Sequence, residues 1–407
     1  MPVTHKFMFN RLVQSFTNDC ITRFKLITSQ NMKNFIESVL SKFKYEDCFL
    51  VNICFYLRYM IKIKEIFKNN NVNCSYFDFI ENKYKYEDLV IELNYLIHEC
   101  QEKVNKLPFA ANLIIGKIYD LLSERTSASE SFKKAIYYDN DYLKYITNEN
   151  TIYTYIDKIY ENSIFDNKIN IFNSPIYNKN VTIVFSVDEK FFRAYITNIL
   201  NMCNILKDIN FHIHIIGEYE NIKKLVEQAL KVNEYINKIY KCENISPTFS
   251  TEEIPNYVND YRTFYACSRY INAQYFMDLF GTDIFIMDID AIFFELPFNY
   301  FKECSNHDVS LAIRTDPLWT SGRRLLAGLV YFKNNDKSRI FLSLVKNYML
   351  SCFSMPYDLW VLDQNALEYA TAFNIVNNLN IDICNSNTMK EKRTVGQNIF
   401  RVILEKY

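Results

Sequence analysis

The sequence predicts a two-part chain, with an all-α region over residues 1–150 followed by an α/β domain with a mostly parallel sheet over residues 181–407. Three observations lead to this fold class. Apolar residues recur at helical spacing in the first part, and short apolar runs alternate with helical stretches in the second. The third is the run IFIMDIDAIFF (284–294), which is apolar except for Asp288 and Asp290.

The first part contains two clear amphipathic helices, because apolar residues follow the i, i+3, i+4, i+7 pattern over 32–43 and 89–100. Small and aromatic residues also match the spacing of a tetratricopeptide unit: Gly116, Tyr119, Ala128, Phe132 and Ala135. Asn140 stands where that repeat usually has proline, and no second copy follows at the repeat period. We predict a helical bundle or degenerate tetratricopeptide-like domain, with a groove for a protein partner as the second interpretation.

Residues 151–180 are predicted to connect the two parts. The stretch is rich in Asn, Tyr and Asp and contains Pro175, and a helix is expected over 152–162.

The second part alternates strands and helices. Strands are expected at 181–186, at 211–217 and immediately before Asp288, with helices ending near 206 and covering 221–232 and 262–279. Ligands of such sheets bind beyond the carboxyl ends of the strands. Asp188 and Asp288 are expected at that edge.

Asp288 and Asp290 form a D-x-D pair that is a candidate metal site. Because side chains alternate along a strand, we expect both carboxylates on the same face. Such oxygen ligands suit Mg²⁺ or Mn²⁺, which complete their shells with water and substrate phosphates. The alternative is that the two aspartates cap the turn after the strand.

Composition excludes some classes of function. The net charge of -1, from 46 basic and 47 acidic residues, gives no electrostatic footprint for nucleic acid. Eleven dispersed cysteines without a C-x-x-C pair favour free buried thiols in a reducing compartment. Since we also find no signal peptide and no transmembrane segment, we predict a cytoplasmic protein.

Two other features have competing interpretations. His212 and His214 share one face of a predicted strand, and packing is favoured over metal binding because no further ligand is near in sequence. Trp319, in DPLWTSGRR (316–324), either stacks on an acceptor sugar or belongs to the core.

Four segments, in order, resemble the metal-dependent glycosyltransferases of the type A fold. The resemblance is closest to the glycogenin and lipopolysaccharide-galactosyltransferase family (family 8) and its nucleotide-diphospho-sugar transferase relatives. It implies a Rossmann-like α/β domain and covers roughly residues 180–370. The segments are VTIVFSVDEKFF (181–192), RTFYACSRYINAQYFMDLFGTDIFIMDIDAIFFELP (262–297), AGLVYF (327–332) and LDQNAL (362–367).

The resemblance implies a role for each matching residue. Ser186, Val187 and Asp188 would contact the nucleotide base, and Arg269 would contact the diphosphate region. Asp288 would hold the ribose and the metal, and Asp290 would hold the metal. Ala327 and Gly328 would contact the donor sugar, and Asp363 and Gln364 would lie near its anomeric carbon. Two simpler interpretations stay open. Arg269 could be an exposed helix arginine, and Asp363 could cap the helix that follows it.

The chain departs from the family pattern in two places. Leu326 stands where the family often has asparagine, and the C-terminal His-x-x-Gly-x-x-Lys segment is missing. Lys392 and Arg393 could replace the lysine but not the histidine, which is a metal ligand in the family. A weaker or water-completed metal site is therefore expected.

The resemblance implies transfer of a sugar, with retention, from a UDP-sugar to an unidentified glycan or protein acceptor, with Mn²⁺ or Mg²⁺ as cofactor. Two alternatives stay open. One is a helical adaptor whose transferase domain has lost catalysis, which would fit the missing histidine. The other is a sugar nucleotidylyltransferase, against which stands the absence of glycine from residues 181–216.

Overall fold

The computed structural model divides the chain into two compact units. Unit 1 comprises Met1–Lys158 and Arg314–Arg324, and unit 2 comprises Ile159–Ile313 and Leu325–Tyr407. The sequence analysis placed all of residues 181–407 in one domain, whereas here Arg314–Arg324 belongs to the helical unit. The structure describes residues 30–43, 49–138, 168–173, 181–241, 245–293, 298–318, 321–353, 361–386 and 395–396. The helix expected over 152–162 lies outside these ranges.

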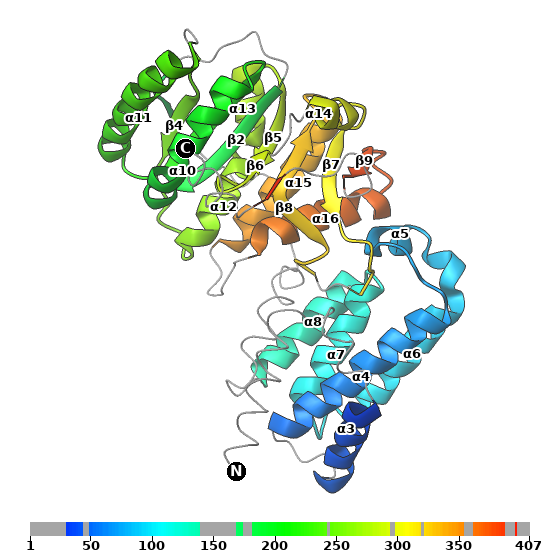
Figure 1. The fold of residues 1–407 in the computed structure, drawn as a ribbon. Helices are drawn as coiled ribbons and strands as arrows, with labels where there is room; N and C mark the ends of the chain where they lie inside the picture. Colours follow the sequence, from blue (N-terminus) through cyan, green and yellow to red (C-terminus); the bar gives the residue numbers. More distant parts are fainter. Residues whose placement is uncertain are drawn as a thin grey trace. The chain divides into compact units, whose positions relative to one another are not determined.

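The helices of unit 1, blue to cyan in Figure 1, pack around an apolar core. They are α3 (Gln30–Phe43), α4 (Phe49–Asn69), α5 (Tyr76–Glu81), the 3₁₀ helix η1 (Lys83–Tyr86), α6 (Glu87–Gln101), α7 (Pro108–Leu121) and α8 (Arg125–Tyr137). Local chemistry explains their starts. Ser75 and Asp78 form a capping box at α5, and a proline opens α7.

Helices α7 and α8 approach each other closely. A Cβ added at Gly116 would lie 2.8 Å from ring atoms of Phe132, so only glycine fits there. Ala128 and Ala135 are fully buried on α8. The close packing expected from these small residues is confirmed, while the tetratricopeptide-like assignment stays a prediction.

Unit 2 is built on a mixed sheet of eight strands in the order β1-β4-β3-β2-β5-β8-β7-β9. The pairs β4–β3, β3–β2, β2–β5 and β7–β9 are parallel. The pairs β1–β4, β5–β8 and β8–β7 are antiparallel. Its strands are β1 (Asn170–Ile171), β2 (Val181–Asp188), β3 (Ile209–Ile216), β4 (Thr248–Glu252), β5 (Asp283–Met287), β7 (Val309–Ile313), β8 (Leu325–Phe332) and β9 (Ile383–Asn385). A small second sheet pairs β6 (Ile292–Phe293) with β10 (Val395–Gly396). The mostly parallel α/β class is confirmed. Strand β1 lies within the stretch that was expected to be only a connection.

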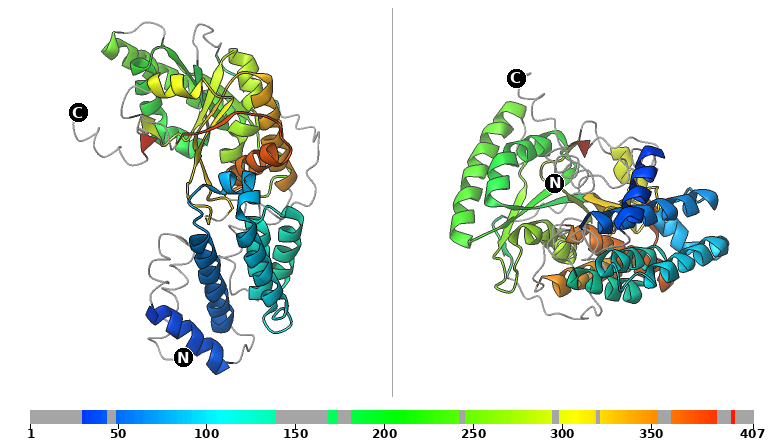
Figure 2. Two further views of the ribbon diagram at one scale, coloured as in Figure 1. Left: turned by 90° about the vertical axis from the view of Figure 1, so that its right-hand side faces the viewer. Right: turned by 90° about the horizontal axis from the view of Figure 1, so that it is seen from below.

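Helices cover both faces of this sheet (Figures 1 and 2). Ile183, Phe185 and Val187 of β2 pack with α10, α11 and α14 on one face, and α12, α13, α15 and α16 contribute to the other. These helices are α10 (Glu189–Ile205), α11 (Tyr219–Tyr240), α12 (Tyr261–Ile271), α13 (Ala273–Phe280), α14 (Phe298–Cys304), α15 (Asp336–Cys352) and α16 (Leu362–Val376). The single helix expected over 262–279 is interrupted at Asn272.

His212 and His214 belong to a buried polar layer between the sheet and α12–α13. His212 contacts Thr248 and Ser250 hydroxyls at 2.7 and 2.8 Å, and His214 contacts the Ser250 hydroxyl at 2.7 Å. His214 Nε2 lies 2.9 Å from Glu252 Oε1. Burial holds the pKa of His212 well below its usual value, so this histidine stays neutral. Both histidines are thus buried and hydrogen-bonded within the fold, as the packing interpretation expects.

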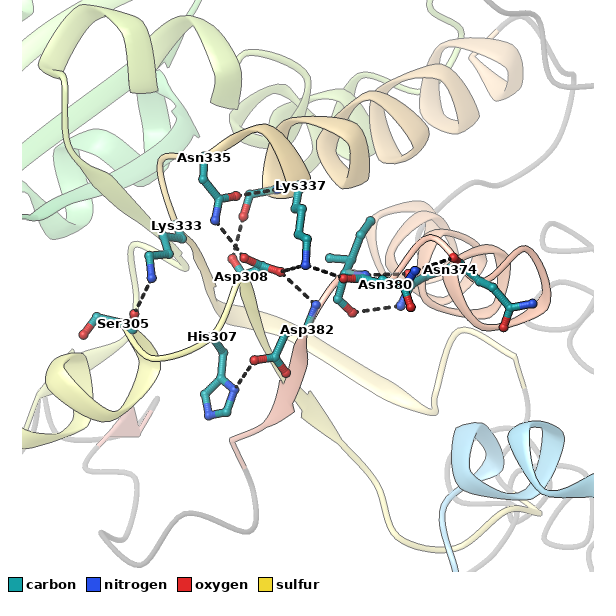
Figure 3. Close-up of polar contacts among 12 residues, drawn as sticks. Ser305, His307, Asp308, Lys333, Asn335, Lys337, Asn374, Asn380 and Asp382 are labelled. Atoms are coloured by element: carbon teal, nitrogen blue, oxygen red, sulfur yellow. Dashed lines mark hydrogen bonds and ion pairs between the residues drawn. The ribbon is translucent and has the colours of Figure 1, made fainter.

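A second polar cluster ties together three connections around Asp308 (Figure 3). The Asp308 carboxylate accepts hydrogen bonds from the Asn335 amide at 2.7 Å and the Asp382 backbone at 2.9 Å, and it lies 3.6 Å from Lys337 Nζ. Burial opposes ionisation of Asp308, but these bonds and the lysine charge lower its pKa. The cluster fixes the loops that precede β7, α15 and β9.

The cysteines of the described ranges are free, and most are buried. Burial raises the pKa of Cys203 and Cys267 well above the usual value, which makes these thiols inert. Among the described residues, no helix combines the length and apolar character needed to cross a bilayer.

Candidate functional site

The predicted site residues gather at the carboxyl edge of β2 and β5. These two strands are parallel neighbours in the sheet. The next strands along the chain, β3 and β4, lie on one side of β2, and β5 then lies on its other side, so the strand order reverses at β2. The crevice at such a reversal of strand order is where open α/β sheets bind ligands. Asp188 ends β2 and Asp288 directly follows β5, as expected from the sequence.

Arg269, on α12, is a buried cation at this edge. Its side chain is 4% exposed, and its guanidinium lies 2.6 Å from Asp288 Oδ1 and 3.8 Å from Asp363 Oδ2. It also donates a hydrogen bond of 2.9 Å to the carbonyl of Met287, the last residue of β5. The interpretation of Arg269 as an exposed helix arginine is therefore wrong. One buried cation joins two carboxylates that are 75 positions apart in sequence.

Asp288 and Asp290 lie in a turn rather than on a strand. Strand β5 ends at Met287, and the backbone of Ala291 donates to the carbonyl of Asp288 at 3.0 Å. Strand alternation therefore does not set the directions of these two side chains, and the expectation based on it is wrong. Burial, and then the negative charge of Asp288, raise the pKa of Asp290, so the two carboxylates repel each other when both are ionised.

This acidic pair fits a divalent cation, which would relieve the repulsion between its carboxylates. Arg269 lies 2.6 Å from Oδ1 of Asp288, and the Asp288 side chain remains 33% exposed. In the described part of the chain, no group of three or more His, Cys, Asp or Glu side chains could hold a metal ion. Water or substrate oxygens would have to complete the shell of a cation at Asp288 and Asp290.

Strand β8 runs directly beside Asp288. The Asp288 backbone donates to the Gly328 carbonyl at 3.0 Å, and a Cβ added at Gly328 would lie 2.7 Å from Asp288 Oδ2. The Tyr270 hydroxyl donates to the Ala327 carbonyl at 2.7 Å. A side chain at 328 would therefore force the Asp288 carboxylate to move. Leu326, where the family often has asparagine, is 37% exposed.

Asp363 lies in the first turn of α16. Its Oδ1 accepts a 2.8 Å hydrogen bond from the Gln364 backbone, while its Oδ2 faces Arg269. Helix α16 already begins at Leu362, with Val361 as the preceding cap residue, so Asp363 is not the helix cap. Burial raises the pKa of Asp363 to about 6, although Arg269 acts in the opposite direction. Gln364 is half-buried beside it.

A hollow of about 730 Å³ lies at the ends of β2 and β3. Asp188 lines it with Glu189, Lys190, Arg193, Ala194, Ile216 and Tyr265. Asp188 also caps α10, since Oδ1 accepts from the Phe191 backbone at 2.7 Å. Burial and then the charge of Asp188 raise the pKa of Tyr265.

Ser186 and Val187 precede this hollow on β2. The buried Ser186 hydroxyl has no hydrogen-bond partner among the described residues. The Val187 side chain packs into the core below α10, so only its backbone could contact a ligand.

Sequence reasoning missed Tyr265 and Tyr270. Tyr265 is four residues before Arg269 on α12 and so shares its helix face, and this spacing was the available signal. Tyr270 had no comparable signal, because its partner is a backbone carbonyl of a distant strand. Trp319, Lys392 and Arg393 lie outside the described residues.

No family model and no curated protein matches the chain. Solved structures with partial similarity include the apo form of the glycosyltransferase GlyE of Streptococcus pneumoniae TIGR4 (13% identity, 51% of this chain and 45% of that chain, TM-score 0.31). Another is the apo form of mouse xyloside xylosyltransferase 1 (8% identity, 50% of this chain and 84% of that chain, TM-score 0.30). A third is the apo structure of the bifunctional glycosyltransferase WbbM (12% identity, 55% of this chain and 39% of that chain, TM-score 0.28). The match spans less than half of GlyE and of WbbM. TM-scores this low establish no shared activity.

Proposed function

We propose that this protein transfers a sugar from a nucleotide-diphosphate donor to a glycan or protein acceptor. The observation that carries the proposal is the buried Arg269, which joins Asp288 after β5 to Asp363 on α16 at the switch point of the sheet. A buried cation between two carboxylates, beside a strand with no Cβ at Gly328, supports a preorganised polar site rather than a packed strand end.

The nucleoside part of the donor would occupy the hollow beside Asp188. A carboxylate accepts hydrogen bonds only, so Asp188 favours a base with a ring N–H, such as uracil. Tyr265 supplies an aromatic surface in the same hollow. This chemistry is compatible with a UDP-sugar as donor, which the resemblance in sequence implies.

The diphosphate would lie toward Asp288, Asp290 and Arg269. Carboxylates outnumber the single buried arginine here, so a bare diphosphate would meet net negative charge. Mn²⁺ or Mg²⁺ held by Asp288 and Asp290 would neutralise that charge and act as a Lewis acid toward the leaving diphosphate. Arg269 keeps the Asp288 carboxylate in one orientation, ready for the cation.

Asp363 and Gln364 would contact the donor sugar. Both lie at the start of α16, and Asp363 is anchored through Arg269 to the same Asp288 that would face the metal. A carboxylate and an amide can bind sugar hydroxyls and support positive charge that develops at the anomeric carbon. Retention of configuration, a cytoplasmic location and a protein partner for the helical unit are further parts of the proposal that rest on the sequence alone.

The test is release of free nucleoside diphosphate from a panel of nucleotide sugars, with Mn²⁺, with Mg²⁺ and with a chelator. We expect release from a UDP-sugar that requires the ion and is lost in Arg269→Met. Binding of UDP without any release, over the whole panel and with candidate acceptors, would favour a transferase-like adaptor. Formation of a nucleotide sugar from a nucleoside triphosphate and a sugar phosphate would instead indicate a nucleotidylyltransferase.

A further inference from the structure

The segment Arg314–Arg324 joins two strands of unit 2 but folds into unit 1. It connects β7 to β8, and its two ends meet through a 2.9 Å hydrogen bond from the Arg314 backbone to the Arg324 carbonyl. Leu318 packs against the helical core. The chain thus leaves the sheet, enters the helical core and returns directly into β8.

Arg324 of this segment is buried in unit 1. It is 1% exposed, and its guanidinium binds Asp120 of α7 through both terminal nitrogens, at 3.3 and 2.7 Å. The guanidinium also lies 3.5 Å from the ring centroid of Tyr76, whose hydroxyl donates to the Asp120 carbonyl at 3.0 Å. A planar fork on a carboxylate, stacked on an aromatic ring, allows little movement of the residue that carries it.

Strand β8 begins directly after Arg324 and leads to the candidate site. Gly328 is the fourth residue after Arg324, and an extended strand spans only about 13 Å over that distance, with no slack. Gly328 accepts the backbone hydrogen bond of Asp288, and Ala327 accepts that of the Tyr270 hydroxyl. Arg324 therefore immediately precedes the strand that lies against Asp288.

We propose that Arg324 is a positioning residue of the donor site, held by Asp120 and Tyr76 of the helical unit. The inference rests on the proposed function, and it makes the helical unit a structural part of the enzyme instead of an independent adaptor. Arg324 touches no substrate in this proposal. It acts by fixing the start of β8, and through it Ala327 and Gly328.

The test compares Arg324→Lys with a matched control in the same unit. Lysine keeps the charge but loses the fork and the stacking. Lys62 is the control, since it also pairs with a carboxylate, Glu99 at 2.7 Å, and lies 4.8 Å from the Tyr59 ring centroid, but no strand of the sheet follows it. Hydrogen exchange of Leu325–Leu329, the donor KM and kcat, and the melting temperature are measured for both Arg324→Lys and Lys62→Met.

We expect Arg324→Lys to speed exchange over Leu325–Leu329 and to raise the donor KM on the order of tenfold, because misplacement by about 1 Å can cost up to about a hundredfold. Lys62→Met should lower only the melting temperature. Unchanged exchange and kinetics in folded Arg324→Lys would overturn the proposal. Should Arg324→Lys not fold, the double variant Asp120→Leu/Arg324→Met removes both buried charges together and is judged by the same readouts. Failure of the wild type to bind UDP with Mn²⁺ would overturn the proposed function, and the exchange comparison would still decide whether Arg324 anchors β8.

Discussion

Asp363 is a buried carboxyl group whose negative charge, in the proposed mechanism, faces the donor sugar. Its pKa is raised to about 6 by burial, against the pull of Arg269, so the folded protein binds this proton more tightly than the unfolded chain does. The group therefore favours the folded state below pH of about 4, and that contribution is lost as the pH rises through about 6.

We predict that Asp363→Asn stabilises the ligand-free protein at neutral pH. Asparagine removes the buried charge and keeps the shape, so the melting temperature should rise above that of the wild type. The difference should narrow between pH of about 6 and about 4, where the wild-type carboxyl becomes protonated. Thermal melts of both proteins over this pH range give the answer, and a lower melting temperature of the variant at pH 7 would contradict it.

Turnover should change in the opposite direction. Asp363→Asn and Gln364→Ala are expected to lower kcat and kcat/KM together, with little effect on UDP affinity, because their contacts would form mainly in the transition state. The wild-type kcat should rise through a pKa near 6 that Asp363→Asn lacks. Transfer, donor hydrolysis and UDP binding are measured in parallel. Full turnover in both folded variants would place the sugar elsewhere.

Asp290 provides the test of metal dependence. We expect Asp290→Ala to abolish the gain in UDP affinity that Mn²⁺ gives the wild type, since one of the two carboxylates is lost. Calorimetric titration of UDP with and without Mn²⁺ measures this gain. Asp278→Ala, which removes a carboxylate that is 65% exposed and paired with Arg339, is the control and should leave it unchanged. Equal Mn²⁺-dependent affinity in Asp290→Ala and wild type would rule out the metal role.

The location of a single residue was predictable from the sequence where its type and its place next to a strand determine where it lies. Asp188 and Asp288 lie at the expected edge, because both directly end or follow strands that the apolar pattern reveals. The partner of Arg269 was not predictable in the same way. Its contacts depend on where α12 and α16 meet the sheet, and such a three-way meeting leaves no periodic signal in the sequence.

At the scale of elements, the contact between β8 and the turn after β5 decides the shape of the site. Gly328→Ala would place a Cβ 2.7 Å from Asp288 Oδ2, while Arg269 holds the other oxygen at 2.6 Å. The carboxylate must move, so we predict a loss of Mn²⁺-dependent UDP affinity on the order of tenfold, since misplacement by about 1 Å can cost up to about a hundredfold.

Gly281→Ala is the matched control for this prediction. Gly281 has a φ of +65° and nothing within 4 Å, so alanine there strains the backbone without touching the site. This variant should lose about 1 kcal/mol of stability and keep its UDP affinity. Unchanged affinity in folded Gly328→Ala would show that the glycine serves packing alone.

Element types were easier to predict than element ends. Strands β2 and β3 and helix α10 match the expected ranges closely, because period-two and period-3.6 patterns are strong there. Helix α11 continues to Tyr240, eight residues past the expected end, with no proline or glycine to stop it. Strand β5 stops at Met287 although apolar residues continue, because a turn at Asp288–Ala291 interrupts the run.

In the whole molecule, the chain passes from one unit to the other three times, between residues 158 and 159, 313 and 314, and 324 and 325. We predict that limited proteolysis cuts within 150–180, where composition marks a connection. The two fragments should nevertheless stay together in size-exclusion chromatography, because Arg314–Arg324 remains folded into the helical core. Separation of the nicked fragments without denaturant would contradict the assignment of this segment to unit 1.

The sequence predicted two parts but not their shared segment. In the sequence, Arg323 and Arg324 are adjacent arginines in a polar stretch, and such a pattern ordinarily indicates an exposed loop. Its burial depends on one carboxylate and one tyrosine brought together by helices α5 and α7, so the interaction exists only in the assembled unit.

The Asp120–Arg324 pair also sets an order of events during synthesis. The two residues are 204 positions apart, so a ribosome adding about 5–20 residues per second makes the arginine about 10–40 s after the aspartate. Throughout that interval the N-terminal helices carry a carboxylate and an apolar surface whose partners do not yet exist. The nascent helical unit is therefore exposed to chaperones and proteases until the sheet is more than half made.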